Sequence, residues 1–142
     1  MAQAAREGAG ADARLVAAAD ATPDTLLAAQ AYLFVCPENL ATMSGMMKEM
    51  FDRCYYPLLR RVEGRAYATA IAAGSDGTGA LAQIDRIVTG WRLKRVAEPV
   101  IVNMQAQTPE AILAPKTVGG DRLETCRELG AALSEGLKLG IF

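Results

Sequence analysis

Apolar positions change their spacing along the chain in a way that predicts alternating strands and helices. The runs 31–35 (Ala-Tyr-Leu-Phe-Val) and 66–73 (Ala-Tyr-Ala-Thr-Ala-Ile-Ala-Ala) are almost continuously apolar and too short for helices. They predict strands that are buried on both faces. Weaker runs at 13–18 and 96–104 predict two further strands.

Between these runs, apolar residues recur at spacings of three and four, as on one face of an amphipathic helix. Long helices are therefore expected from Ser44, over 79–91 and from Asp121 onward. Shorter helical segments are expected at 2–8, at 23–29 after the capping sequence Thr22-Pro23-Asp24, and for a turn or two after Thr108-Pro109-Glu110.

Strands separated by helical segments of ten or more residues are typical of right-handed βαβ crossovers. We therefore predict an α/β fold with a parallel sheet between two helical layers, forming one domain over 1–142. In such sheets ligands bind beyond the carboxyl ends of the strands. This rule draws attention to the loops that follow 31–35 and 66–73.

Composition narrows the classes of function. A formal net charge of −1 argues against a nucleic-acid partner, and no apolar run approaches the ~20 residues of a membrane span. The first residues lack the charged and then apolar pattern of a signal peptide. Cys36, Cys54 and Cys126 are expected to be reduced thiols in the core. A cytoplasmic protein is therefore expected. The absence of histidine excludes Ser-His-Asp triads and zinc sites that need imidazole, and no metal site is predicted.

The first loop, 36–45, leaves a buried strand and ends where a helix begins. It offers backbone amides, the Glu38 carboxylate, the Asn39 amide and the Met43 thioether beside the positive end of a helix dipole. The alternative is an ordinary connection in which Asn39 and Ser44 only form a turn and a cap.

The second loop, 74–79, has three glycines in six residues, which allows the backbone to approach a planar or charged group closely. It matches neither the P-loop nor the dinucleotide-binding pattern. The alternative is a flexible turn in which Ser75 or Asp76 caps the next helix.

Together these loops carry a resemblance to a known family. The segments Cys36-Pro37-Glu38-Asn39, Met43-Ser44-Gly45, Phe51-Asp52-Arg53 and Tyr55-Tyr56-Pro57 resemble the flavin-ring-binding loop and following helix of flavodoxin-like proteins. The resemblance is to the branch of NADPH-dependent FMN reductases and NAD(P)H quinone reductases. The stretch Gly74-Ser75-Asp76-Gly77-Thr78-Gly79 resembles the next loop of that family.

The resemblance implies FMN at the carboxyl edge of a five-stranded sheet of order 2-1-3-4-5. Amides around Glu38 and Asn39 would bond the pyrimidine edge and N5 of the ring, and 74–79 would pack on its other side. NAD(P)H would be the co-substrate, a small molecule the electron acceptor, and a homodimer the assembly. The flavin carries the chemistry, so no catalytic side chain is expected. The implied cofactor-binding residues are Pro37, Glu38, Asn39, Leu40, Met43, Ser44, Gly45, Gly74, Ser75, Asp76, Gly77, Thr78 and Gly79.

The family's first strand and phosphate-binding loop have no counterpart, because Met1 falls inside the helix that would follow them. Either the recorded chain begins too late, or it is a shortened relative that has lost tight FMN binding. We favour the first explanation, because 31–104 keep the flavin-facing pattern, including a glycine-rich loop that is entropically costly.

Two other functions remain open at this point. A flavodoxin-type electron carrier is one, although such carriers are usually strongly acidic and this chain is not. A non-catalytic domain is the other, in which Met43, Met46 and Met47 would form an exposed partner surface. Glu38 and Asp76 could tune a flavin or simply cap turns, and Tyr55 and Tyr56 could stack near a ligand or belong to the core.

Overall fold

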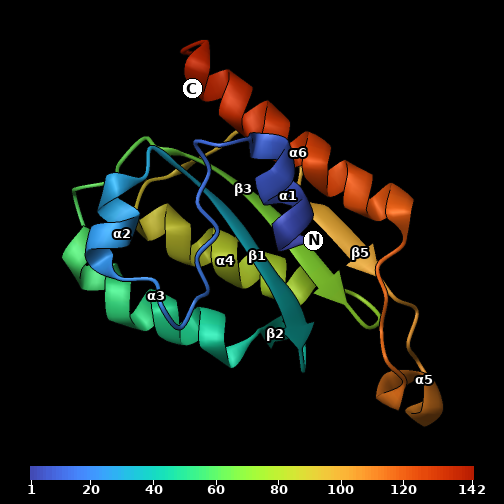
Figure 1. The fold of residues 1–142 in the computed structure, drawn as a ribbon. Helices are drawn as coiled ribbons and strands as arrows, with labels where there is room; N and C mark the ends of the chain where they lie inside the picture. The colour runs from blue at the N-terminus through green and yellow to red at the C-terminus, as the bar shows by residue number, and fades with distance from the viewer.

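A mostly parallel sheet lies between two layers of helices in the computed structural model, which describes residues 1–142 (Figure 1). The parallel strands are β1 (Ala31–Asn39), β3 (Ala66–Ala73), β4 (Lys94–Arg95) and β5 (Val100–Asn103). The short β2 (Thr42–Met43) turns back antiparallel to the end of β1. The predicted α/β architecture is therefore present.

The centre of the sheet is β3, which pairs with β1 on one side and with β4 and β5 on the other. Seven of its eight residues are buried, as its nearly continuous apolar sequence predicted. The run predicted at 96–104 forms β5 only from Val100, directly after Pro99, whereas β4 pairs separately with the start of β3. Proline has no backbone N–H to give to a ladder, so it marks the break between the two strands.

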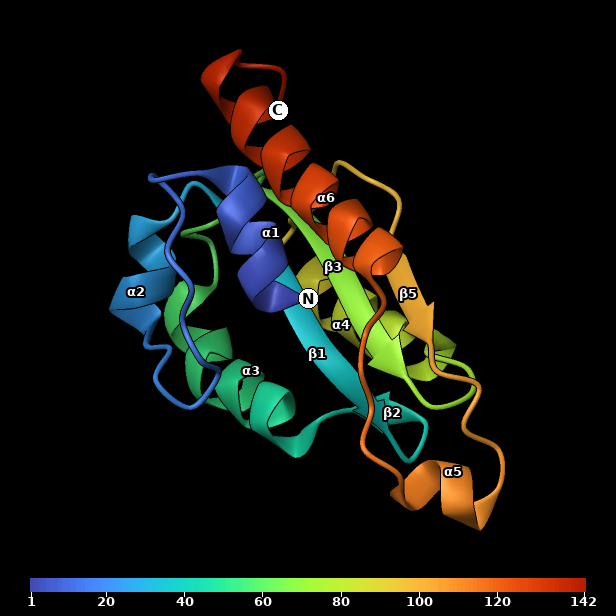
Figure 2. The ribbon, with the colours of Figure 1, turned by 45° about the vertical axis from the view of Figure 1, so that its right-hand side comes forward.

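The helices divide between the two faces of the sheet (Figure 2). One face is covered by α1 (Ala2–Ala9) and α6 (Gly120–Lys138), and the other by α2 (Pro23–Ala28), α3 (Gly45–Leu58) and α4 (Thr78–Gly90). The larger core lies under α3 and α4, where Phe51 packs between Phe34 and Trp91. The short α5 (Pro109–Leu113) lies apart from both layers.

The predicted helix starts are confirmed by their caps. The hydroxyl of Thr22 accepts a hydrogen bond from the Thr25 N–H at 3.2 Å, and that of Thr108 accepts one from the Ala111 N–H at 3.2 Å. Ser44 caps α3 in the same way. These bonds satisfy N–H groups that have no partner inside the helix.

The strand predicted at 13–18 does not form. This segment belongs to no helix or strand, and β1 pairs along 31–37 with β3 alone. A strand exists only where a second strand supplies hydrogen-bond partners, and none meets 13–18. The segment is held instead by Arg53 of α3, whose guanidinium donates to the carbonyls of Ala18, at 3.1 Å, and Ala21.

The methionines expected to form an exposed surface do not lie together on one. Met43 and Met47 are only 2% and 7% exposed and belong to the main core, whereas Met46 is 56% exposed. The helical spacing puts Met46 and Met47 on different faces of α3, and β2 turns Met43 inward.

None of the helices combines the length and apolar character needed to cross a lipid bilayer.

Candidate functional site

The loops that follow β1 and β3 meet at the carboxyl edge of the sheet through the side chain of Glu38. Its two carboxylate oxygens accept hydrogen bonds from the backbone N–H groups of Gly77, at 2.8 Å, and Ala80, at 2.9 Å. The negative charge therefore lies at the positive end of the α4 dipole. The interpretation of 36–45 and 74–79 as neighbouring loops is confirmed.

This contact also takes the place of the local cap that the alternative interpretation of 74–79 offered for α4. The N-cap residue is Gly77, in the left-handed conformation, and neither Ser75 nor Asp76 caps the helix. The Asp76 carboxylate accepts a hydrogen bond from the Thr78 hydroxyl instead. The alternative interpretation, with a cap from Ser75 or Asp76, is therefore wrong, because a carboxylate from a distant strand reaches these N–H groups instead.

The turn between β1 and β2 has a strained backbone. Leu40 and Ala41 have φ angles of 52° and 60°, in the left-handed region that residues with a Cβ rarely adopt. Each such residue costs about 1–2 kcal/mol. The Met43 N–H donates to the Gln83 side chain of α4 at 2.9 Å, which holds the strained turn against that helix.

Two glycines of the second loop are required by close packing. A Cβ at Gly79 would overlap the Ala41 carbonyl oxygen, and a Cβ at Gly77 would clash with Ile101. Gly74 is different, because the nearest atoms to its added Cβ lie 3.9 Å away on Ala106. Packing therefore explains two of the three glycines, whereas a Cβ at the exposed Gly74 would make only an ordinary contact with Ala106.

A third loop, which sequence reasoning missed, reaches the same edge from β5. The Asn103 side chain donates to the Ser75 carbonyl and accepts from the Gln105 N–H at 2.8 Å. The Ala106 N–H donates to the Gly74 carbonyl at 2.7 Å. Only the position of Asn103 at the end of a predicted parallel strand could have pointed to it.

The predicted cofactor-binding residues differ in what they can offer to a ligand. Glu38, Ser44 and Gly79 are partly buried. The Glu38 carboxylate caps α4 and the Ser44 hydroxyl caps α3. Met43 and Gly77 are buried. The exposed members are Pro37, Asn39, Leu40, Gly45, Gly74, Ser75, Asp76 and Thr78. The edge therefore presents backbone groups, an amide, a carboxylate and the hydroxyls of Ser75 and Thr78, which can position a polar planar molecule.

The thiol nearest to this edge is not activated. Burial raises the pKa of Cys36, which is 5% exposed, so the neutral thiol is favoured. Cys54 and Cys126 are also buried, so the prediction that all three cysteines lie in the core is confirmed. No group of three Cys, Asp or Glu side chains is placed to hold a metal ion.

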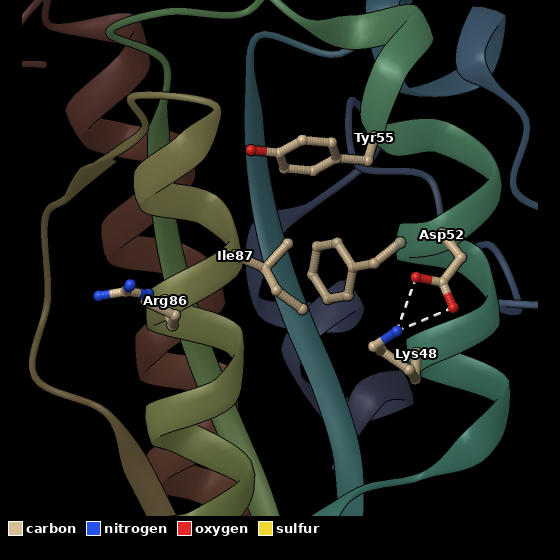
Figure 3. Close-up of a pocket in the computed structure, with 6 residues that line it drawn as sticks. Lys48, Asp52, Tyr55, Arg86 and Ile87 are labelled. Atoms are coloured by element: carbon tan, nitrogen blue, oxygen red, sulfur yellow. Dashed lines mark hydrogen bonds and ion pairs between the residues drawn. The ribbon is translucent and has the colours of Figure 1, made fainter.

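A separate cavity of about 270 Å³ lies between α3 and α4 (Figure 3). Its lining residues are Lys48, Phe51, Asp52, Tyr55, Arg86 and Ile87. Lys48 and Asp52 form an ion pair at 2.6 Å, and the ring of Tyr55 lies over Gly90, at the end of α4. These residues lie along the two helices rather than at the strand ends, so this cavity is distinct from the edge formed by the three loops.

Comparison with known proteins places this geometry among flavin-binding folds. Residues 3–107 match the family model described as NADPH-dependent FMN reductase. Among curated protein sequences, none matches the chain.

Solved structures share the fold at low identity. A flavodoxin from the domain Archaea superposes with a TM-score of 0.73 at 16% identity, covering 96% of this chain and 87% of that one. A WrbA-like flavodoxin from Agrobacterium tumefaciens gives 0.68 at 20% identity, with coverage of 96% and 87%. A flavone reductase gives 0.69 at 16% identity, covering 96% of this chain and 57% of that one. These likenesses confirm the predicted flavodoxin-like fold.

Proposed function

Because the chain belongs to the family of NADPH-dependent FMN reductases, we propose that it binds FMN at the carboxyl edge of its sheet and transfers electrons from NAD(P)H to a small-molecule acceptor. When bound, the flavin supplies the chemistry, by accepting a hydride and passing electrons on. The observation that carries the proposal is the joining of two loops by Glu38 at this edge.

The exposed backbone on either side of that junction is assigned to the flavin ring. One side is the turn at Asn39–Ala41, and the other is Gly74–Asp76. The Gly74 position fits such a group, because its backbone is exposed and carries no side chain that would keep a ring away. The Glu38 carboxylate is occupied by α4, so its role is to hold the two loops at a constant spacing.

The assembly and compartment are part of the same proposal. We assign the protein to the cytoplasm, which suits three reduced and buried thiols. We also assign a homodimer, with the exposed side chains of Met46 and Tyr56 on α3 as candidate contacts. Light scattering tests the assembly directly.

Flavin binding is tested by titrating the protein into FMN and, separately, into riboflavin, while following flavin fluorescence. Since the assigned residues contact only the ring, riboflavin and FMN should bind with similar dissociation constants. The substitution Gly74→Leu places a bulky side chain on this exposed backbone and should weaken both at least tenfold. Ala132→Leu, on the exposed face of α6, is the matched control.

The proposal fails if neither flavin binds saturably, or if Gly74→Leu binds as tightly as the unchanged chain. Oxidation of NADH and NADPH with flavin and a quinone present, followed by absorbance, then tests the reductase activity separately from binding.

A further inference from the structure

The loops that follow α3 and α4 concentrate positive charge. Residues 59–65 and 91–95, here called the basic edge, contain six basic residues and one acidic residue, Glu63. Their formal net charge is +5, so with −1 for the whole chain the remaining residues carry −6. Positive and negative charge are therefore segregated in this protein. The basic residues are Arg60, Arg61, Arg65, Arg92, Lys94 and Arg95.

Hydrogen bonds between the two loops hold them together at the amino edge of the sheet. The Gly64 N–H donates to the Arg92 carbonyl at 2.9 Å, and the Lys94 N–H donates to the Arg65 carbonyl at 3.0 Å. Figure 1 shows both loops at the end of the sheet away from α5. The eight residues of β3 separate this end from the carboxyl edge by about 25 Å. The basic edge is therefore remote from the proposed flavin site.

Two of the six cations are used by the fold. The Arg65 guanidinium donates to the carbonyls of Leu26, at 3.2 Å, and Leu27, at 2.9 Å, near the end of α2. Arg95 forms an ion pair with Asp85 of α4. Both side chains are therefore explained by contacts within the chain.

The other four cations are exposed and have little acidic compensation. The side chains of Arg60 and Lys94 make no hydrogen bond or ion pair. Arg61 donates only to one carbonyl of α3, at 3.4 Å. The side chain of Arg92 is 75% exposed, and its ion pair with Glu63 is 3.6 Å long. These four side chains leave most of their hydrogen-bond donors to solvent.

Two of these arginines also occupy strained positions. Arg60 and Arg92 have φ angles of 61° and 54°, and each comes directly after the C-cap residue of α3 or α4. This left-handed conformation at a helix end favours glycine, which has no Cβ. The ends of α1 and α6 use glycine there, with φ angles of 83° at Gly10 and 65° at Gly140. The basic edge thus carries arginine where the chain elsewhere uses the unstrained residue.

The helix ends and the sheet edge account for only part of this charge. Each helix C-terminus is equivalent to about half a negative charge, so the ends of α3 and α4 together balance about one cation. Lys94 lies on β4, at the edge of the sheet, where a charge also prevents pairing with a further strand. Two of the four exposed cations therefore remain without a role inside the chain.

We propose that the basic edge binds a short acidic segment of another protein. The planar fork of arginine matches the geometry of a carboxylate, and four exposed cations suit a run of three or four glutamates or aspartates. Complementary charge of this kind sets the choice and orientation of a partner. A partner held at the amino edge leaves the carboxyl edge of the sheet open.

The distribution of charge favours a short segment over an extended polyanion. A nucleic-acid strand or a lipid surface would reach beyond the basic edge to residues whose net charge is −6, and these residues would repel it. Bases would also find no ring to stack on, because Trp91 is the only aromatic residue of the basic edge and is buried.

The probe is a capped peptide of eight glutamates with an uncharged fluorophore, titrated with the whole chain while the anisotropy is followed. Binding should saturate at 20 mM sodium chloride, and the dissociation constant should rise at least tenfold at 200 mM. Arg60→Asn combined with Arg92→Asn should weaken binding at least fivefold. The same pair should not lower the midpoint of thermal unfolding, because asparagine adopts a positive φ more readily than arginine.

Two further pairs of substitutions separate the basic edge from net charge and from strain. Arg61→Gln combined with Lys94→Gln removes two exposed cations that have no positive φ, and it should also weaken binding at least fivefold. Arg14→Asn combined with Arg122→Asn removes the same charge from exposed positions outside the basic edge. This control should change the dissociation constant less than twofold.

Three results would overturn the proposal. The first is no saturable binding of the glutamate peptide at 20 mM salt. The second is an equal loss of affinity in the control pair, because net charge alone would then explain binding. The third is tighter binding of labelled octathymidylate or of phosphatidylserine vesicles that the substitutions at Arg60 and Arg92 abolish, which would assign the basic edge to nucleic acid or to a lipid surface. No flavin is added in these experiments, so the proposed oxidoreductase function is tested independently.

Discussion

Glu38 shows at the scale of one residue how a distant contact changes an interpretation. Its carboxylate was open to two roles, tuning a flavin or capping a turn. The structure gives it a third, because it caps a helix that begins 40 positions further along the chain. The same two bonds hold both loops of the candidate site together.

Removing this carboxylate should destabilise the fold. Hydrogen bonds to a charged group contribute about 1.5–3 kcal/mol each, so Glu38→Ala, which removes two of them, should lower the free energy of unfolding by about 3–6 kcal/mol. Glu38→Gln keeps one acceptor oxygen and should lose about half as much. Urea unfolding followed by circular dichroism measures both. The exposed Glu128→Gln is the control and should change little, and equal stability of Glu38→Ala and the unchanged chain would contradict this role.

Substitutions that relieve the strain in the turn at Leu40–Ala41 should increase the stability of the fold. Asparagine and glycine adopt positive φ angles readily, so the double substitution Leu40→Asn and Ala41→Gly should raise the unfolding free energy by about 1 kcal/mol. The chain offers a matched control, the exposed pair Leu113–Ala114, where Ala114 has a φ of −63°. The same exchange there should give no gain. A lower urea midpoint for the turn variant would show that the Leu40 side chain makes contacts that outweigh the strain.

Tyr67 gives a prediction for pH dependence. Burial is the main cause that raises the pKa of Tyr67 above its ordinary value of 10.0, and its hydroxyl donates to Asp85 at 3.0 Å. The folded state therefore holds this proton more tightly than the unfolded state does. The resulting stability is complete below pH 10 and is lost as the pH rises through the folded pKa.

The measurement compares unfolding midpoints of the unchanged chain and Tyr67→Phe between pH 8 and 11. The difference between the two should shrink above pH 10, because only the unchanged chain has this proton to lose. Using the difference removes the contributions of the buried cysteines and Tyr32, whose pKa values are also raised by burial. A difference that does not vary with pH would contradict the assignment.

At the scale of elements, α1 and α6 pack with their backbones in direct contact. An added Cβ at Gly8 would overlap the Arg127 carbonyl, and one at Gly130 would overlap the Ala5 carbonyl. Ala4 and Ala5 of α1 and Cys126 of α6 are likewise small and buried. Helix-forming composition predicted α1 and the spacing of apolar residues predicted α6, but neither indicated that the two helices would be in contact.

Alanine at these glycines should force the two helices apart. Backbone atoms cannot move aside cheaply, so Gly8→Ala or Gly130→Ala should cost about 1–3 kcal/mol in unfolding free energy. Gly45→Ala, at the first position of α3 with nothing within 4 Å, is the control and should be neutral or stabilising. Thermal unfolding compares the three variants. A stabilising Gly130→Ala would mean that the helices do not pack as closely as described.

On the scale of the whole molecule, residues 107–119 form an arm that projects beyond the carboxyl edge (Figures 1 and 2). Its helix α5 leaves Ile112 and Leu113 exposed by 59% and 84%. Its carbonyls are bonded locally, for example by the Lys116 ammonium, which donates to the Ile112 carbonyl at 3.0 Å. The arm therefore keeps its form without support from the two helical layers.

An unsupported arm should be the first place at which a protease cuts. Brief treatment with chymotrypsin should cleave after Leu113 and give the fragments 1–113 and 114–142, identified by mass spectrometry. The fragments should elute together on gel filtration, because α6 remains packed on α1 and the sheet. Leu113→Ser should slow the cut. A first cut within 31–104 would contradict this picture.

The sequence alone was sufficient for most local structure. The continuous apolar run at 66–73 predicted β3 with its observed bounds, and Thr22, Ser44 and Thr108 marked three helix starts. The loops of the candidate site were found in the same way, from their places after buried strands. These features depend on the side-chain periods of strands and helices and on caps within a few residues, so they can be read along the chain.

Only the tertiary structure decided which of these segments meet. The extended segment 13–18 remains unpaired because a strand is a relation between two segments, and no neighbour supplies its hydrogen bonds. The partners of Glu38, the left-handed turn at Leu40–Ala41 and the contact of Gly130 with α1 likewise depend on residues brought together from distant positions. The local periodicity of apolar residues carries no information about such tertiary contacts, because these contacts depend on how the helical layers pack on the sheet.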